Sequence, residues 1–352
     1  MRMHLPLTYR WCIAALVLLY GCLFGSLLSG RVGFVAVSAD QELRRVTEMD
    51  WRSGDEKVYR EKVEEMFFHT YDAYMNYAFP MDEIRPMTCK GVDTLGGYSV
   101  TLIDSLDTLA VLGDCEELWK QMEWVAEIPD FAIDRNVSVF ETNIRMVGGL
   151  LGAHFVTGEE SACGRKQKSD LIGEKNRQAD GLEASGDPDS KEDLVWEKRL
   201  QWREKVLYLA TDLAERLLLA FDTSTKMPYG TVNLKYGIPN AETPITASAG
   251  VGTFAVEWEY LSAVTGRKEF AMAAREAVEA LYSHRTHYGL VGTHIDTQSG
   301  KWVTRSGGIG SYVDSYIEYL VKGWIMTQEP VYGSKYASTY AAAMGILYDK
   351  QR

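Results

Sequence analysis

Apolar side chains recur at three- and four-residue spacing along most of the chain beyond about residue 57. This spacing places them on one face of an amphipathic helix. The first such stripe is Val63, Met66, Phe67, Tyr71, Tyr74 and Ala78. Further helical stretches fall at 102–110, 117–126, 144–155, 197–221, 252–265, 269–284, 315–328 and 334–348. The pattern predicts an all-α protein, and it fits both a ring of antiparallel helix pairs and an irregular helical bundle.

Two short segments depart from the helical period. Residues 291–295 and 301–303 alternate around a polar turn, which predicts a small β-hairpin. Residues 162–194 are rich in Lys, Asp, Glu, Gly and Ser and nearly lack large apolar residues. Such a composition cannot bury enough apolar surface to offset the entropy of ordering, so it predicts a disordered insertion.

The N-terminus carries a leader at about residues 1–39. Arg2 and Arg10 precede an uncharged apolar run from Trp11 to Leu28. The run is long for a signal peptide and long enough for a short membrane span, and Val37-Ser38-Ala39 offers a cleavage site. A cleaved signal peptide and a retained signal anchor therefore both stay open. Either one directs the rest of the chain, after a polar linker at 40–56, into a lumen.

The cysteines fit that route. Cys12 and Cys22 lie in the apolar run, which leaves Cys89, Cys115 and Cys163 for an oxidising compartment. Three thiols form at most one internal disulfide, and we expect Cys89–Cys115, with the other pairings open. The net charge of −12 argues against a nucleic-acid partner, because such partners favour a basic face.

Glu141 is the first candidate site residue. Ser138 and Glu141 have the spacing of a capping box, in which the side chains satisfy helix-start amides. Arg145 follows four residues later on the same helical face, as an ion-pair partner or as a group that contacts a sugar hydroxyl. The spacing alone favours a structural cap for Glu141 and leaves catalysis as the alternative.

Asp314 is the second candidate. It follows Gly307, Gly308 and Gly310, which allow a backbone to approach a ligand closely. Ser315 and Glu318 again have capping-box spacing, so a structural cap is the alternative.

Two further polar features stand out. Asp104 and Asp107 lie three residues apart on an otherwise apolar helix, where an unpaired buried carboxylate is costly. We expect one to face solvent and the other to be a site residue or an acid satisfied by backbone amides. Asn136-Val137-Ser138 is a sequon, which predicts N-glycosylation of Asn136 in a lumen.

Several of these segments, in this order, together resemble the class I α-1,2-mannosidases of glycoside hydrolase family 47. They are most similar to the ER degradation-enhancing α-mannosidase-like branch, which carries Gly at the position of Gly250, as here. The resemblance covers about residues 57–348, apart from the insertion. Its motifs are Phe67–Tyr74, Asp82–Cys89, Thr101–Leu109, Ser138–Arg145, Gly148–Leu151, Met227–Asn233 and Val313–Leu320.

The resemblance implies an (α/α)7 barrel with a central site, an inverting mechanism and one Ca²⁺ held against the sugar. It implies that Glu141 is the general acid, acting through water, and that Asp314 is a second catalytic carboxylate. It also implies that Arg145, Glu318 and Asp107 line the substrate pocket. Inversion requires two carboxyl groups on opposite faces of the sugar with room for a water.

The sequence departs from the family pattern at its end. The family's later Arg-Pro-Glu segment, with another catalytic carboxylate, and its Thr-Glu segment, whose Thr ligates Ca²⁺, are absent from these 352 residues. We expect a C-terminally truncated barrel of about four of seven helical hairpins. We also expect no calcium ligand in this chain and little or no hydrolase activity. A shortened gene model or a splice form is the expected origin.

The resemblance implies trimming of high-mannose N-glycans on misfolded glycoproteins during ER-associated degradation. The expected location is the ER lumen or the lumenal side of its membrane, with an ER redox partner possible. The alternative function is a non-catalytic module that binds glycans or misfolded glycoproteins. A glucoamylase-like helical barrel is a third hypothesis, and it requires a different motif set.

Overall fold

The structure is a computed structural model that describes residues 55–158, 161–164 and 188–348. The predicted leader, almost all of the predicted linker and most of the predicted insertion lie outside these ranges. The chain divides after Phe68 into two units, and only 55–68 of the first unit are described. No helix in the described ranges is both long and apolar enough to cross a membrane.

Helices dominate the described residues, which confirms the predicted all-α class. The α-helices are α3 (Asp55–Tyr77), α4 (Val100–Leu112), α5 (Cys115–Ala126), α6 (Val139–Glu141), α7 (Gly148–Val156), α9 (Pro188–Leu218), α10 (Ser248–Gly252), α11 (Ala255–Thr265), α12 (Glu269–Ser283), α13 (Asp314–Thr327) and α14 (Pro330–Ile346). The π-helix η1 (Thr142–Val147) joins α6 to α7, and the 3₁₀ turn η2 (Leu219–Phe221) follows α9.

Short strands supply the β-excursions. The strands are β1 (Glu83–Arg85), β2 (Lys90–Val92), β3 (Asn136–Ser138), β4 (Thr231–Asn233), β5 (Ile245–Ala247), β6 (Gly292–Asp296) and β7 (Trp302–Gly307). They pair antiparallel as β1–β2, β3–β4 and β5–β6–β7. The predicted hairpin is confirmed as β6–β7, and the chain adds β5 to its edge.

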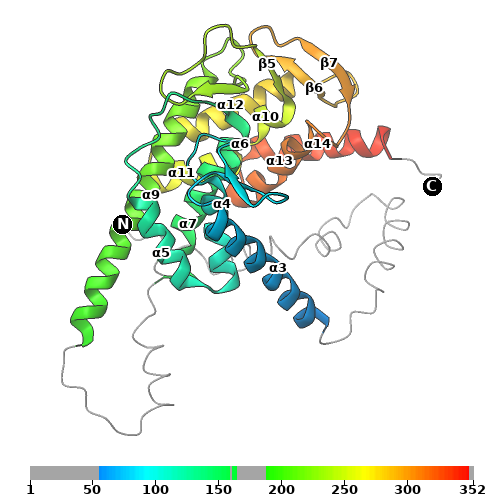
Figure 1. Ribbon diagram of the computed structural model, residues 1–352. Coiled ribbons are helices and arrows are strands. Elements are labelled where there is room, and N and C mark those ends of the chain that lie inside the picture. Colours follow the sequence, from blue (N-terminus) through cyan, green and yellow to red (C-terminus); the bar gives the residue numbers. More distant parts are fainter. Residues whose placement is uncertain (1–54, 159–160, 165–187, 349–352) are drawn as a thin grey trace. The chain divides into compact units, whose positions relative to one another are not determined.

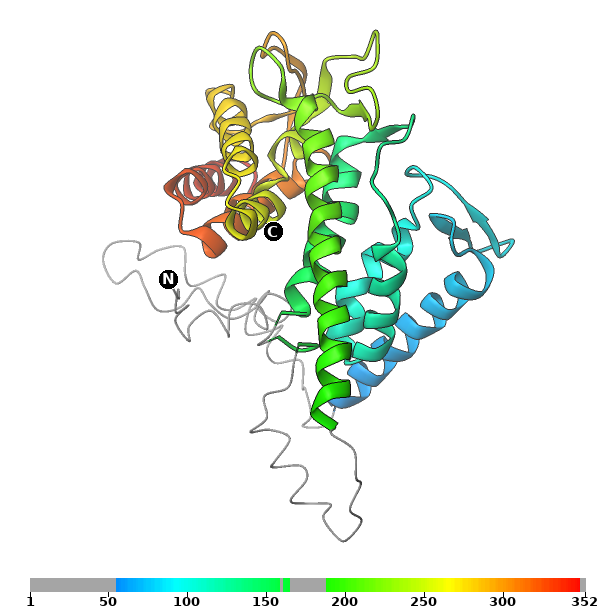
Figure 2. The same cartoon turned by 90° about the vertical axis from the view of Figure 1, so that its left-hand side faces the viewer.

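Within the second unit, helices pack mainly against helices close in sequence. α4 contacts α5 and α7, α11 contacts α12 and α13, and α13 contacts α14 (Figure 1). The long helix α9 packs against both α5 and α7, and Figure 2 shows it running along these earlier helices. Successive helix pairs of this kind are one of the two arrangements that the apolar spacing left open.

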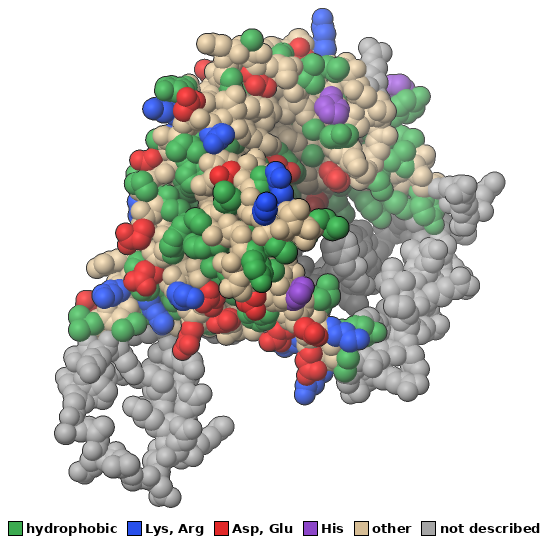
Figure 3. Space-filling model, in the orientation of Figure 1, with side chains coloured by type: hydrophobic (Ala, Val, Ile, Leu, Met, Phe, Trp, Pro, Cys, Tyr) green, Lys and Arg blue, Asp and Glu red, His purple; other side chains and the backbone are tan. Residues whose placement is uncertain are grey.

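Two regions show how the apolar stripes are buried. Leu102, Leu106 and Leu109 of α4 are fully buried, as their spacing on one face predicts. Around Trp258 of α11, the rings of Phe221, Phe254 and Phe270 lie 4.8, 4.9 and 5.8 Å away between centroids. On the face seen in Figure 3, acidic and basic side chains of the described residues are interspersed among apolar ones.

Helix α9 begins at Pro188, nine residues before the start expected at Glu197. The charge-rich composition that predicted disorder to residue 194 also suits a helix start. Proline is favoured in the first helical turn, and acidic residues near a helix N-terminus are stabilised by its dipole.

The expected Cys89–Cys115 disulfide is wrong, because Cys115 pairs with Cys163. Cys115 opens α5, and the Cα atoms of the two half-cystines lie 5.3 Å apart. The Nε1 of Trp119, one turn into α5, donates to the carbonyl oxygen of Cys163 at 3.1 Å and fixes the same contact. Cys89 is a free, exposed thiol. Tertiary packing after α7 decides the pairing, and sequence spacing does not report it.

Candidate active site

Asp82 organises the loop that leads into α4. Its fully buried carboxylate accepts hydrogen bonds from five backbone N–H groups of that loop. The donors and distances are Thr94 (3.0 Å), Leu95 (2.7 Å), Gly97 (2.8 Å), Tyr98 (2.8 Å) and Val100 (3.3 Å). A carboxylate has about four lone-pair positions that can accept hydrogen bonds. The side chain of Asp82 therefore pairs backbone N–H groups of the loop that a neighbouring strand would otherwise pair.

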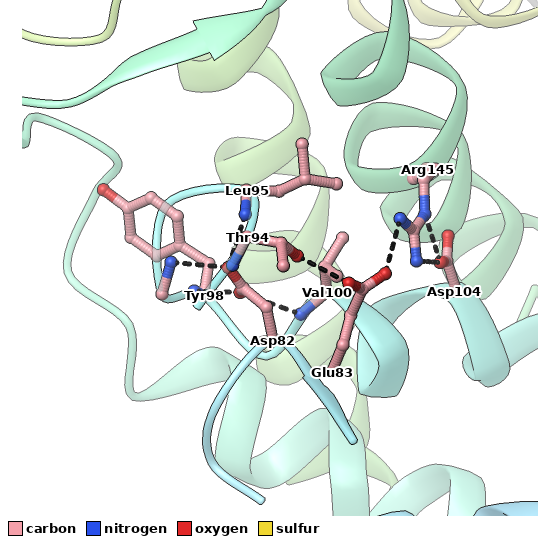
Figure 4. A network of polar contacts seen from close by, with 9 residues as sticks. Asp82, Glu83, Thr94, Leu95, Tyr98, Val100, Asp104 and Arg145 are labelled. Carbon is pink, nitrogen blue, oxygen red and sulfur yellow. Dashed lines mark hydrogen bonds and ion pairs between the residues drawn. The ribbon is translucent and has the colours of Figure 1, made fainter. Parts of the chain in front are cut away.

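The loop in turn fixes Glu83, the neighbour of Asp82 in β1. One carboxylate oxygen of Glu83 accepts the hydroxyl of Thr94 at 2.8 Å. The other lies 3.2 Å from Nη1 of Arg145 (Figure 4). Nε and Nη2 of Arg145 each lie 2.7 Å from Oδ2 of Asp104 on α4. Arg145 therefore joins β1, η1 and α4 through two carboxylates.

Asp104 and Asp107 are both half-buried. Burial raises the pKa of Asp104, and the nearby carboxylates of Asp107 and Glu141 raise it further, against the lowering effect of Arg145. Burial also raises the pKa of Asp107. A Cβ at Gly152 of α7 would lie 2.9 Å from Oδ2 of Asp107, so this carboxyl fills the space that glycine leaves.

Glu141 is half-buried at the junction of α6 and η1. Its backbone N–H donates to the hydroxyl of Ser138 at 3.3 Å, which is half of the predicted capping box. The π-helix that begins at the next residue is a rare element that occurs frequently at functional sites. Capping here engages the backbone of Glu141 and does not use its carboxylate, so the cap and a chemical role are compatible.

Asp314 is exposed and is the first residue of α13. Its Oδ1 accepts the backbone N–H of Ser315 at 3.0 Å. The Ser315–Glu318 capping box is not formed, because α13 starts at Asp314, two residues earlier than a Ser315 cap requires. The hydroxyl of Ser315 instead accepts from Thr253 at 2.9 Å, and Glu318 pairs with Lys322 at 2.5 Å.

Glu257 of α11 is a candidate that the sequence reasoning missed. It is buried among α11, η1 and α13, and its two carboxyl oxygens accept from Asn143 Nδ2 at 3.1 Å and Tyr319 Oη at 2.7 Å. Burial raises its pKa to about 7, and these hydrogen bonds act in the opposite direction. Glu257 thereby connects η1, which follows Glu141, to α13, which carries Asp314 and Glu318. An acid within the apolar run 254–258 is the signal that could have revealed it.

Gly250 of α10 marks a tight place beside β5. A Cβ there would lie 3.1 Å from the hydroxyl oxygen of Thr246, closer than ordinary packing allows without a shift. A larger, acidic side chain at this position would require Thr246 to move.

The described ranges contain no group of three or more His, Cys, Asp or Glu residues arranged to hold a metal ion.

Asp82→Asn is expected to lower the free energy of unfolding by at least about 3 kcal/mol, since a hydrogen bond to a charged group contributes roughly 1.5–3 kcal/mol. The amide nitrogen of asparagine cannot accept, so two or three of the five loop bonds are lost. Hydrogen exchange at Thr94, Leu95 and Tyr98 should accelerate together. Asp93→Asn is the control, because Asp93 accepts one bond, from the Asp82 N–H at 3.2 Å, and asparagine keeps an acceptor. Equal effects of the two variants would contradict the assigned role.

A family model described as glycosyl hydrolase family 47 matches residues 66–351. The human ER degradation-enhancing alpha-mannosidase-like protein 2 is 46% identical over 280 residues, 80% of this chain and 43% of that protein. Alpha-mannosidase I MNS4 of Arabidopsis thaliana is 40% identical over 292 residues, 83% of this chain and 42% of that protein. The chain thus spans less than half the length of these two relatives.

Among solved structures, the alpha-1,2-mannosidase from Trichoderma reesei matches with a TM-score of 0.65 and 25% identity. The match covers 82% of this chain and 55% of that one.

Proposed function

Because this chain belongs to glycosyl hydrolase family 47, we propose that it forms the acid-bearing part of an inverting α-1,2-mannosidase that trims high-mannose N-glycans. Its fold is of the (α/α)7 class. The observation that carries the proposal is the cluster in which Arg145 joins Glu83 to Asp104 beside Glu141. These charged groups come from β1, α4 and the α6–η1 junction.

We assign Glu141 the role of general acid and Asp314 that of a second catalytic carboxylate. An inverting glycosidase needs one carboxyl that protonates the leaving oxygen and another that activates water on the opposite face of the sugar. Burial raises the pKa values of Asp104 and Asp107, the two carboxyls of α4. Arg145, Glu318 and Asp107 are the proposed substrate-contacting residues, and Arg145 offers planar donors suited to vicinal hydroxyls.

The cellular part of the proposal rests on relatives whose names describe enhancement of ER degradation. We place this chain in the ER lumen or at the lumenal side of the ER membrane, acting on misfolded glycoproteins. Cleavage or retention of the leader within 1–39, and an ER redox partner, stay predictions.

We further propose that residues 40–352 alone have little hydrolase activity. Support comes from the share of the solved mannosidase that the chain covers, 55%. The test compares residues 40–352 with a hybrid in which the unmatched C-terminal part of the human relative is appended. We expect mannose release from a high-mannose glycan by the folded hybrid only.

Three outcomes separate the hypotheses. Release by residues 40–352 contradicts the predicted inactivity, and no release by a folded hybrid contradicts the mannosidase proposal. The alternative, a non-catalytic binding module, would use the same polar Glu83–Arg145–Asp104 cluster to bind a glycan without hydrolysing it. Glycan binding by residues 40–352 that is lost in Arg145→Ala and unaffected by calcium chelation would support that alternative.

A further inference from the structure

The sequon Asn136-Val137-Ser138 forms the whole of strand β3. β3 pairs with β4 so that Asn136 lies opposite Asn233 and Ser138 lies opposite Thr231. Val137 is buried beneath the strand, while Asn136 and its neighbours Asp134 and Arg135 are exposed. The amide side chain of Asn136 is therefore on the open face of a two-stranded sheet.

Hydrogen bonds fix which way this amide points. The side-chain oxygen of Asn233 accepts the backbone N–H groups of Lys235 and Tyr236, both at 3.0 Å, so its nitrogen lies on the other side. That nitrogen donates to the carboxylate of Asp134 at 2.9 Å, and a carboxylate can only accept. The same nitrogen lies 2.9 Å from the Asn136 side chain, which must present its oxygen, Oδ1. Nδ2 of Asn136 is thus directed away from Asn233, and no described residue accepts a hydrogen bond from it.

Ser138 has a separate structural task. It is the N-cap of α6, and its hydroxyl accepts the backbone N–H of Glu141. An N-cap hydroxyl satisfies an amide that the helix cannot pair by itself. The serine that completes the sequon therefore also holds the turn that carries Glu141.

We propose that Asn136 carries an N-linked oligosaccharide and that Ser138 acts twice, first in the sequon and then as the cap beneath Glu141. This inference rests on the lumenal location in the proposed function. In the modification, Nδ2 of Asn136 forms a bond to the anomeric carbon of an oligosaccharide. The bond from that carbon to the pyrophosphate of a polyisoprenoid lipid donor breaks, the lipid pyrophosphate leaves, and Nδ2 loses one proton. The Oδ1 bond to Asn233 stays intact, because Nδ2 bears the glycan.

Four variants separate the two tasks of Ser138. Ser138→Thr keeps both the sequon and a capping hydroxyl, and Ser138→Ala removes both. Ser138→Asp keeps a capping oxygen and destroys the sequon. Asn136→Gln removes the glycan and leaves the cap. The full chain is expressed in eukaryotic cells with a sequon-bearing tag after Arg352, which reports lumenal entry.

We expect the wild type and Ser138→Thr to lose one more glycan than the other three variants on treatment with peptide N-glycosidase. After that treatment, the amide of Glu141 should exchange about fivefold faster in Ser138→Ala than in Ser138→Asp, as the loss of one N-cap predicts. If the tag carries a glycan and Asn136 does not, the proposed glycosylation of Asn136 is wrong, and the lumenal location is still supported. An unmodified tag overturns both. Equal exchange in the Ala and Asp variants overturns the second role of Ser138.

Discussion

Replacing Cys115 and Cys163 together by serine is expected to lower the free energy of unfolding by about 4 kcal/mol. The two half-cystines lie 48 residues apart in sequence, and closing a loop of that length restricts the unfolded chain by about this amount. Loss of the bond also frees the segment whose Cys163 carbonyl accepts from Trp119. Equilibrium denaturation of the oxidised wild type and the double variant measures the difference.

Cys89→Ser is the matched control, because Cys89 is exposed and unpaired. It should change the unfolding free energy by less than about 0.5 kcal/mol, as surface substitutions usually do. A variant set in which Cys89→Ser and Cys115→Ser are equally destabilising, while Cys163→Ser is not, would instead support the pairing first expected from the sequence.

The pH dependence of stability is expected to contain two opposing contributions, from Glu257 and His154. Burial raises the pKa of Glu257 from its usual 4.5 to about 7. Between these values the folded chain keeps a proton that the unfolded chain releases, so stability falls as pH rises through the window. The contribution amounts to about 3 kcal/mol, at 1.36 kcal/mol for each pKa unit.

His154 acts in the other direction. Burial, with a smaller contribution from Arg203, lowers its pKa from 6.5 to about 4. Below pH 6.5 the His154 side chain of the unfolded chain binds a proton, whereas that of the folded chain binds it only near pH 4. Stability therefore falls as pH falls through this range. The imidazole Nδ1 lies 3.0 Å from the hydroxyl of Tyr260, which a neutral ring accommodates. Over the shared range the two contributions partly cancel in the wild type.

Single variants expose each contribution. Glu257→Gln should gain stability relative to the wild type as pH rises from about 4.5 to 7, by about 3 kcal/mol in total. His154→Asn should gain relative to the wild type as pH falls from about 6.5 to 4. The quantity to compare is the slope of the unfolding free energy against pH. The absolute value also changes, because the amide of glutamine turns a donor toward Asn143 or Tyr319 at every pH. Parallel stability profiles for the wild type and both variants, from urea unfolding at pH 4–8, would contradict the two assignments.

The helices and the β-hairpin were predictable because each follows a local spacing of apolar residues. The stripe Leu102, Leu106, Leu109 marks α4 by its spacing alone, and the alternation at 291–303 marks β6–β7. Long-range contacts follow no such rule. The pairing of Cys115 with Cys163 and the five amides that converge on Asp82 depend on how loops fold back, which spacing does not encode.

The candidate site shows the same limit. Arg145 and Asp104 were both noticed, yet their ion pair joins residues 41 positions apart. The i,i+4 pairing of Arg145 with Glu141 was the local alternative, and the structure instead turns the guanidinium toward Glu83 and Asp104. Ser138 caps its helix as the pattern predicts, while Ser315 does not, because α13 starts two residues earlier than a Ser315 cap requires. Glu257 escaped notice since one acid in an apolar run has no partner visible in the sequence.

The central claim is that this chain supplies the general acid of a family 47 mannosidase, and Glu141→Gln in the completed hybrid tests it most directly. Glutamine keeps the shape of the side chain and the Ser138 cap, and it cannot deliver a proton. Glu123→Gln, at an exposed position on α5, is the matched control. The account predicts that Glu141→Gln lowers kcat/KM for mannose release by about 10²–10⁴-fold while the control is unchanged. A Glu141→Gln hybrid that releases mannose at the rate of the control would contradict it.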